Sequence, residues 1–332
     1  GRLAIARSAN PGALGFAVAS CFAWNLKITC SKQLPRICMA AVLFFAEVFL
    51  FKGMYDARQS TVASDRNFYG VTRIEDRNIF SGRRKVAVRE LLHGQITHGM
   101  QALRDPDLRQ TAGAYYSPGS GIATAFLIHP RRTSDPGPLN IGVLGLGIGT
   151  IAAFAKPGDQ LRFYEINPAV INYSTGPEPL FTYLNDCKGT VETISGDARL
   201  MLARELEAGS GNGFDILVMD AFSSGSVPAH LLTREAFEVY LRHLRDENSI
   251  LAINISNRFL DFRDLMLGIA AEFNLNATII DNDGDAPDYI ASRWCLMTRS
   301  DRLRASGFDH ETTSRPIVWT DDFSNVFQLL KQ

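Results

Sequence analysis

From residue 140 onward the sequence repeats one unit: a short apolar run, a turn with glycine or an acid, and a stretch with helical spacing. Strands that alternate with helices are typical of an α/β fold, in which helices cover both faces of a mostly parallel sheet. The expected strands are 140–145, 161–166, 190–194, 214–219, 249–254, 276–281 and 290–298, and the expected helices include 197–208, 229–243 and 261–273. The last two strands follow each other closely, so we expect one to insert antiparallel at an edge.

The turn after the first strand carries three glycines at alternate positions, Gly145, Gly147 and Gly149. In open parallel sheets, ligands bind beyond the carboxyl ends of the strands. Glycines there let the backbone approach a ligand closely, and the following helix offers unpaired N–H groups. Glycines also occur at such turns for conformational reasons alone, so this motif needs support from other groups.

Acidic residues follow the next three strands. Glu165 ends the second strand, where a carboxylate accepts the hydroxyls of a ribose; the alternative is a solvated surface acid. Asp197 follows the third strand, where it could cap the next helix, bind an adenine or do both. We predict its neighbour Ala198 as a further cofactor-binding residue. Asp220 follows the fourth strand, where burial would raise its pKa and suit it as a general base.

Two classes of ligand compete for this arrangement. Dinucleotide sites favour GxGxxG, whereas this chain has GxGxG followed by Thr150, and no second half for a pyrophosphate is evident. Carboxylates suit a ribose, an adenine and a sulfonium cation. The pattern therefore favours S-adenosylmethionine or a related nucleoside over NAD.

The overall composition excludes several classes of protein. Thirty-four basic and 35 acidic residues nearly balance, so nothing calls for a nucleic-acid partner. The cysteines lack CxxC spacing, which argues against a disulfide framework or a metal site. There are five of them: Cys21, Cys30, Cys38, Cys187 and Cys295.

The first 60 residues differ from the rest. Two apolar runs, 11–26 and 37–51, are each shorter than the ~20 residues that span a bilayer. They predict a membrane hairpin or the remnant of a longer membrane region; the alternative is a pair of core helices or an amphipathic pair on a partner. We expect association with a membrane through residues 11–51 and a cytoplasmic catalytic domain, with a soluble cytoplasmic protein as the alternative. The chain does not begin with Met, which is consistent with a fragment.

The sequence thus predicts three parts. Residues 1–60 form an apolar helical segment, 61–130 a small β-rich region, and 131–332 the nucleoside-binding catalytic domain. Within the first two parts, we expect a polar linker at 56–67 and strands at 68–76 and 85–94.

With these residues in place, the sequence resembles the spermidine synthase (aminopropyltransferase) family, and within it the branch fused to membrane segments. The resemblance covers residues 66–326 and rests on several motifs, which are RNFYGVTRI, LLHGQITHGMQ, YYSPGSGIATA, GVLGLGIGTIAAF, FYEINP, SGDARL, MDAFSSGSVPAHLLT and WTDDFSN. It implies a Rossmann-like class I methyltransferase fold after a β-rich region, and a homodimer. It also implies transfer of an aminopropyl group from decarboxylated S-adenosylmethionine to an amine acceptor such as putrescine.

The resemblance assigns roles to the three acids. Glu165 matches the ribose-binding acid, Asp197 the adenine-binding acid, and Asp220 the acid that takes a proton from the attacking amine. The implied mechanism is in-line displacement at the carbon beside the sulfonium, with methylthioadenosine as the leaving group.

The chain departs from the family where amines would bind. Ile148 stands in place of an Asp in the glycine loop, Tyr116, Ser117 and Pro118 in place of a Tyr-His-Glu run, and Ser223 in place of a second Asp. We predict Tyr116, Ser223 and His98 as substrate residues. Other replacements for the missing groups could come from His93, Asp321 or Asp322, whose plainer interpretations are a hydrogen-bonded strand histidine and a helix cap.

Three hypotheses of function follow. The first is a spermidine synthase-like transferase of polyamine biosynthesis with Asp220 as its base. The second is a non-catalytic or regulatory nucleoside-binding domain of a membrane protein. The third is a methyltransferase that uses S-adenosylmethionine at the same nucleoside site.

Overall fold

The computed structural model describes residues 34–81, 84–94, 96–209, 211–221, 228–284 and 290–331. The chain divides into two compact units, Gly1–Ser60 and Thr61–Gln332. Each unit is described by itself below.

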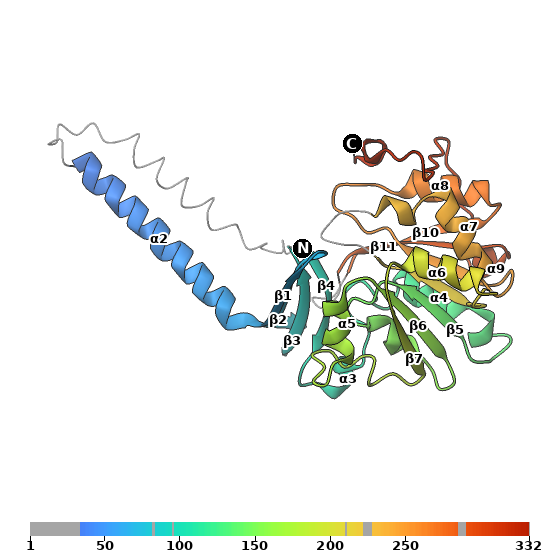
Figure 1. Cartoon of the computed structure of the whole chain (residues 1–332), viewed down its shortest axis with the longest axis horizontal. Helices are drawn as coiled ribbons and strands as arrows, with labels where there is room; N and C mark the ends of the chain where they lie inside the picture. Colours follow the sequence, from blue (N-terminus) through green and yellow to red (C-terminus); the bar gives the residue numbers. More distant parts are fainter. Residues whose placement is uncertain are drawn as a thin grey trace, which may run out of the picture. The chain divides into compact units, whose positions relative to one another are not determined.

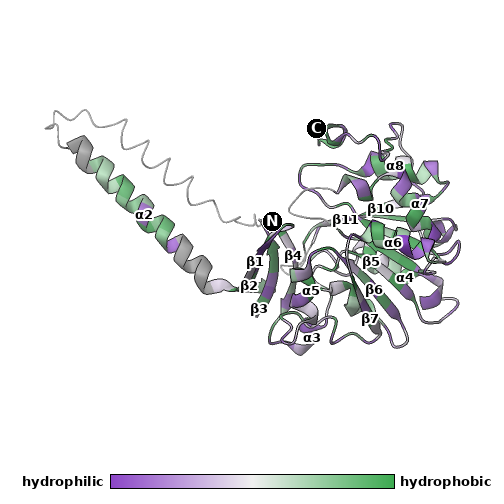
Figure 2. Cartoon of the chain, in the orientation of Figure 1, coloured by the Kyte–Doolittle hydropathy of each residue, from purple (hydrophilic) through white to green (hydrophobic). Residues whose placement is uncertain are grey.

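The described part of the first unit is a long helix, α2 (Leu34–Ser60). Its exposed side chains include a run of large apolar ones between Met39 and Phe51, which colour the middle of α2 mainly green in Figure 2. The polar linker expected at 56–67 is wrong, because the helix continues through Ser60 and the next seven residues form a strand. No helix in the described part of the chain is both long enough and apolar enough to cross a membrane. The first apolar run, 11–26, lies outside the described residues.

The second unit begins with a small antiparallel sheet. Its strands are β1 (Thr61–Asn67), β2 (Gly70–Ser81), β3 (Arg84–His93) and β4 (Ile96–Ala102), paired in that order. Half-buried and exposed residues alternate along β1, as expected where one face of a strand is partly covered. The sheet therefore has one face available to pack against the rest of the unit.

The larger sheet has seven strands, and all seven expected strands are confirmed (Figure 1). They are β5 (Asn140–Leu144), β6 (Gln160–Glu165), β7 (Thr190–Ser195), β8 (Ile216–Met219), β9 (Ile250–Asn254), β10 (Asn276–Asn282) and β11 (Ser292–Thr298). Their order is β10-β11-β9-β8-β5-β6-β7, and among these seven strands β11 runs in the direction opposite to the other six. Thus β11 inserts one position in from the edge, and β10 is the edge strand. This suits the largely buried β11, because an inner strand has partners on both sides.

Helices cover both faces of this sheet. On one face lie α6 (Ala198–Glu207), α7 (Arg234–Arg242) and α8 (Arg263–Glu272), which share a core with alternate strand residues such as Leu217 and Met219. On the other face, α4 (Gly121–Ile128) and α5 (Pro168–Thr175) pack with Ile216 and Val218. The expected helix 229–243 is interrupted, because the hydroxyl of Thr233 accepts from the Ala236 N–H and starts α7 anew. A short 3-10 helix, Ala229–Leu231, precedes it.

Smaller elements complete the unit. They are the helices α3 (Pro106–Arg109) and α9 (Arg302–Ala305) and the 3-10 helices η1 (Pro130–Arg132), η2 (Thr150–Phe154), η3 (Ala229–Leu231) and η4 (Val326–Leu329).

The small sheet and the large sheet share one apolar core. Ile74 of β2 and Leu91 of β3 lie in the same cluster of buried side chains as Ile122, Ile148 and Val143. Helix α4, which precedes residue 131, contacts β8, β9, β10 and β11. The small sheet is therefore held against the loops at the carboxyl ends of the large one, where it can form a wall of a site.

Candidate active site

A cavity of about 430 Å³ lies at the carboxyl ends of the central strands. Most of the residues predicted for the site line it, and these are Gly145, Gly147, Glu165, Asp197, Ala198, Asp220 and His98. Gly149 and Tyr116 lie beside the lining residues rather than among them. Ser223 falls outside the described residues. The small sheet contributes the opposite wall through Phe68, Tyr69, Thr72, Leu91 and His93.

The glycine loop follows β5. Gly145, Gly147 and Gly149 have φ angles of +97°, +54° and +82°, a region that favours glycine. A Cβ atom on Gly145 would lie 2.6 Å from the carbonyl oxygen of Asp220, and one on Gly149 would lie 2.8 Å from Leu184. The loop therefore needs these glycines both for their positive φ angles and because neighbouring atoms leave no room for a Cβ atom. The element after it is the short η2 rather than a longer helix.

The Glu165 side chain is fixed behind the glycine loop. Its Oε2 accepts from the backbone N–H of Leu146 at 2.9 Å, and its Oε1 accepts from that of Asn167 at 2.7 Å. Burial raises the pKa of Glu165, while these backbone donors oppose the rise. The surface-acid interpretation is wrong, since only 9% of the residue is exposed. Each oxygen keeps a lone pair for a ligand hydroxyl.

Asp197 is a helix cap that also borders the cavity. Its Oδ1 accepts from the Leu200 N–H at 3.0 Å at the start of α6, which confirms the capping hypothesis. Its Oδ2 lies 2.8 Å from Nε2 of His230, a cavity-lining residue on η3. His230 was expected to begin a helix that covers the sheet, and its contact with Asp197 could not be read from that pattern. A ligand that uses Asp197 must share this oxygen with His230.

Asp220 is held by two neutral hydrogen-bond donors. The Tyr116 hydroxyl donates to its Oδ2, and Nδ2 of Asn254 donates to its Oδ1 at 2.8 Å. Burial raises the pKa of Asp220 to about 6, although both hydrogen bonds act in the opposite direction. Burial also raises the pKa of Tyr116 well above its usual value, so this hydroxyl keeps its proton at neutral pH. The carboxylate is thus oriented by its donors and ionised at pH 8. Its pKa is close enough to the working pH for it to accept a proton.

Asn254 is a residue that sequence reasoning missed. It ends β9 in ILAIN, one strand along the sheet from the strand that ends before Asp220. A polar residue at the carboxyl end of an apolar strand was the available signal, and it is the same signal that identified Asp220.

Two histidines of the small sheet lie together at the cavity. The rings of His93 and His98 are 5.6 Å apart between centroids. Burial and the neighbouring His93 lower the pKa of His98 to about 4, so its imidazole is neutral at physiological pH. Nε2 of His98 is buried and has no hydrogen-bond partner among the described residues.

The two late aspartates do not line the cavity. Both carboxylate oxygens of Asp321 bind the guanidinium of Arg199, at 2.7 and 2.6 Å, and this pair lowers the pKa of Asp321 to about 2. Asp322 is exposed. The prediction that they replace the amine-binding groups is wrong, because Asp321 is already neutralised by Arg199. The helix-cap interpretation is also wrong, since the 3-10 helix that follows them, Val326–Leu329, is capped by Asn325.

Two of the departures in the sequence, Ile148 and Ser117, map to buried positions, whereas Pro118 is exposed. Ile148 is fully buried, and a Cβ atom on Gly99 of β4 would lie 2.7 Å from it. Ser117 is also fully buried, with its hydroxyl 3.5 Å from Oδ1 of Asn282. Neither side chain lines the cavity, so neither offers a polar group to a ligand there.

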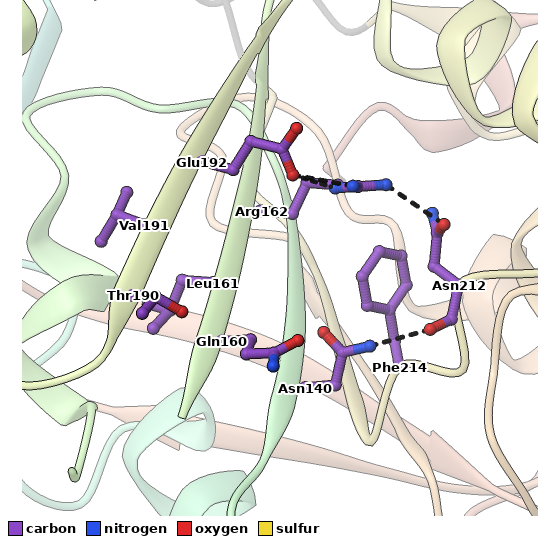
Figure 3. Close-up of a pocket in the computed structure, with 9 residues that line it drawn as sticks. All are labelled: Asn140, Gln160, Leu161, Arg162, Thr190, Val191, Glu192, Asn212 and Phe214. Atoms are coloured by element: carbon purple, nitrogen blue, oxygen red, sulfur yellow. Dashed lines mark hydrogen bonds and ion pairs between the residues drawn. The ribbon is translucent and has the colours of Figure 1, made fainter. Parts of the chain in front are cut away.

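A second hollow, of about 270 Å³, lies at the opposite ends of the strands (Figure 3). Asn140, Gln160 and Thr190, the first residues of β5, β6 and β7, line it. Its polar groups bind one another: the Arg162 guanidinium donates to Glu192 at 2.8 Å and to Asn212 at 3.2 Å. Because ligands of such sheets bind at the carboxyl ends, the first cavity is the candidate site.

The candidate site has an acidic character. Three carboxylates line it, and no lysine or arginine does so among its described residues. The described part of the chain also contains no cluster of ligands suited to a metal ion. A cationic organic ligand fits this lining best.

Comparisons with known proteins agree with this arrangement. A polyamine aminopropyltransferase of Vibrio vulnificus is 32% identical over 124 residues, which cover 36% of this chain and 38% of that protein. An N-terminal histidine N-methyltransferase of Emericella nidulans is 28% identical over 165 residues, which cover 49% of this chain and 28% of that protein. The chain thus aligns with well under two thirds of the length of these relatives. No family model matches it.

Similarity to solved structures extends over more of the chain. A probable spermidine synthase from Corynebacterium glutamicum superposes with a TM-score of 0.50 at 15% identity, over 80% of this chain and 97% of that one. At this identity the likeness shows the fold. The chain therefore has a Rossmann-like, class I methyltransferase-type α/β domain preceded by a small β sheet, and about a third of it is similar in sequence to a polyamine aminopropyltransferase.

Proposed function

We propose that this protein is a spermidine synthase-like transferase that moves an aminopropyl group from decarboxylated S-adenosylmethionine to an amine acceptor. The observation that carries the proposal is the position of Asp220, a carboxylate with a pKa near 6 that two neutral donors orient at the cavity. The similarity to a polyamine aminopropyltransferase supports the same class of reaction.

The nucleoside would bind between the glycine loop and α6. Glu165 would accept the ribose hydroxyls with its free lone pairs, and Asp197 would accept from the adenine amino group. Ile166, which follows Glu165, is 39% exposed and lines the cavity, so it offers an apolar surface for one face of the base. This assignment places the sulfonium near Asp220, where a carboxylate favours the cation.

The charge of the lining favours the decarboxylated donor. S-adenosylmethionine carries a carboxylate at the end of its tail, and a buried anion without a partner is costly. None of the described lining residues is a lysine or arginine, and His98 is neutral. The aminopropyl tail lacks that carboxylate and avoids this penalty.

The reaction would be a single in-line displacement. The acceptor nitrogen attacks the carbon beside the sulfonium, the carbon–sulfur bond breaks, and sulfur keeps the electron pair as the thioether of methylthioadenosine. The proton lost by nitrogen passes to Asp220, which Tyr116 and Asn254 hold in place. Positioning and proton removal would supply most of the acceleration.

Methyl transfer is the second candidate. It is favoured by the similarity to an N-terminal histidine N-methyltransferase over about half of this chain. The same nucleoside site would serve, but the methionine carboxylate would then need a partner. The relative affinity for the two donors separates the two activities.

The test is calorimetric titration with S-adenosylmethionine, its decarboxylated form and methylthioadenosine, followed by a transfer assay that measures methylthioadenosine release. Tighter binding of the decarboxylated donor, with release that depends on an amine and is lost in Asp220→Asn, supports the proposal. Tighter binding of S-adenosylmethionine with methylated product supports the second candidate. Binding without any turnover supports a regulatory domain, and unchanged turnover in Asp220→Asn removes Asp220 from its role.

A further inference from the structure

Three described carboxylates line the cavity, and the donor would occupy two of them. Glu165 binds two backbone N–H groups, and Asp197 caps α6 and contacts His230; in the donor complex proposed above, these two carboxylates face the ribose and the adenine. Asp220, like Glu165, binds only neutral donors. In that complex Asp220 is the described carboxylate left to balance positive charge in the reacting half of the cavity.

The wall opposite the large sheet carries no carboxylate among its described residues. Phe68, Tyr69, Thr72 and Leu91 contribute aromatic, hydroxyl and aliphatic groups, and His93 and His98 contribute imidazoles. The polar atom buried on this wall without a partner is Nε2 of His98, and a buried polar nitrogen requires a hydrogen bond. Because the imidazole of His98 is neutral, it can accept from an ammonium but supplies no negative charge.

His98 and Asp220, two side chains that can accept a hydrogen bond from an ammonium, both lie beside the glycine loop. A Cβ atom on Gly147 would lie 3.2 Å from the backbone oxygen of His98, and one on Gly145 would lie 2.6 Å from that of Asp220. Both residues thus adjoin the glycine loop. If the decarboxylated donor binds there as proposed above, its tail ammonium donates a hydrogen bond to His98. Its sulfonium is then balanced by the negative charge of Asp220.

We propose that the acceptor is a monoamine, with the attacking nitrogen as its one basic group and an apolar remainder against this wall. This inference rests on the proposed function. A diamine brings a second ammonium, for which no described lining carboxylate is left. Leaving such a charge desolvated and unpaired is strongly unfavourable.

The test compares butylamine with putrescine, which differ by one terminal amine on the same four-carbon chain. With saturating decarboxylated donor at pH 8, we expect kcat/KM for butylamine to exceed that for putrescine by at least about tenfold, the usual effect of an unpaired buried polar group. His98→Asp adds a carboxylate to the wall and should lower this ratio by at least about tenfold. His98→Asn, which adds no charge, should keep butylamine the better acceptor. The ratio is the readout, because both variants can lose rate.

Equal or better use of putrescine by the unaltered protein overturns the inference, as does an unchanged ratio in His98→Asp. If neither amine releases methylthioadenosine, the proposed function fails, and binding then decides the inference separately. In that case both amines are titrated calorimetrically into the complex with methylthioadenosine. Tighter binding of butylamine supports a monoamine site; equal or tighter binding of putrescine, or no binding of butylamine, refutes it.

Discussion

Replacement of Asp220 by Asn should stabilise the fold while it abolishes proton transfer. The folded state raises the pKa of this carboxyl from 3.8 to about 6, because burial disfavours its charged form. One pKa unit corresponds to about 1.4 kcal/mol, so ionising Asp220 in the folded protein costs about 3 kcal/mol of stability at neutral pH. Because the carboxylate borders a cavity that water can enter, we expect a measured gain of about 1–3 kcal/mol.

The sign of the pH dependence follows from the raised pKa. The protonated carboxyl is favoured by folding, so its contribution to stability is complete below about pH 4 and is lost as the pH rises through about 6. An amide at position 220 does not titrate, so the variant loses no stability from this position as the pH rises. It can also keep both hydrogen bonds, since the Tyr116 hydroxyl accepts as well as donates and the Asn254 amide can present either end.

The measurement is urea-induced unfolding of both proteins at several values between pH 5 and 8. The free-energy difference between Asp220→Asn and the unaltered protein should be larger at pH 8 than at pH 5. The control is Asp309→Asn, which removes one negative charge from the exposed surface. A difference that is constant with pH, or a loss of stability at pH 8, would refute the assignment of Asp220 as a carboxylate strained by burial.

Three further changes test the groups around Asp220. Tyr116→Phe removes a hydrogen bond that lowers the pKa of Asp220, so the acid limb of the kcat/KM profile should move up by about one pH unit, whereas activity at pH 9 should change far less. Glu165→Gln turns an amide NH₂ toward one of two backbone N–H groups; urea unfolding should show a loss of about 1–3 kcal/mol, and calorimetry should show weaker binding of methylthioadenosine. Gly145→Ala places a Cβ 2.6 Å from the Asp220 carbonyl oxygen at a φ of +97°. The free energy of unfolding should fall by about 1–3 kcal/mol, and most activity should be lost. Gly209→Ala, whose Cβ would meet no atom within 4 Å, is the control for the strain of a positive φ alone.

The large sheet was predictable because its central strands β5, β8 and β9 are apolar runs between turn residues, and its other strands recur at similar spacing between helical stretches. The carboxyl ends of parallel strands meet at one edge, so Glu165, Asp197 and Asp220 could be placed at one site without knowledge of their contacts. Strand β1 was missed because TVASDRN is polar, and its pairing with β2 supplies the order that its composition does not.

Contacts between side chains distant in the chain could not be predicted. The hydrogen bond of Tyr116 to Asp220 joins residues 104 positions apart, and the ion pair of Arg199 with Asp321 joins residues 122 apart. The first depends on how the loop before α4 packs and the second on how the last segment packs, which local periodicity does not encode. The second contact is the reason why an aspartate that looked available for an amine is already neutralised.

The side chain of Ile148 belongs to the core rather than to the cavity, although the glycine loop around it lines the cavity. Its side chain points into the shared core, and the space that it fills is available because β4 has Gly99 opposite, where even a Cβ would lie 2.7 Å from Ile148. An acid at 148 would be buried against this wall without a partner, so the isoleucine and the glycine are complementary. The pair also joins the glycine loop to the strand that carries His98. A change in the packing of the small sheet should therefore disturb the glycine loop and the opposite wall of the cavity together. Under the proposed function, this contact would couple recognition of the donor to recognition of the acceptor.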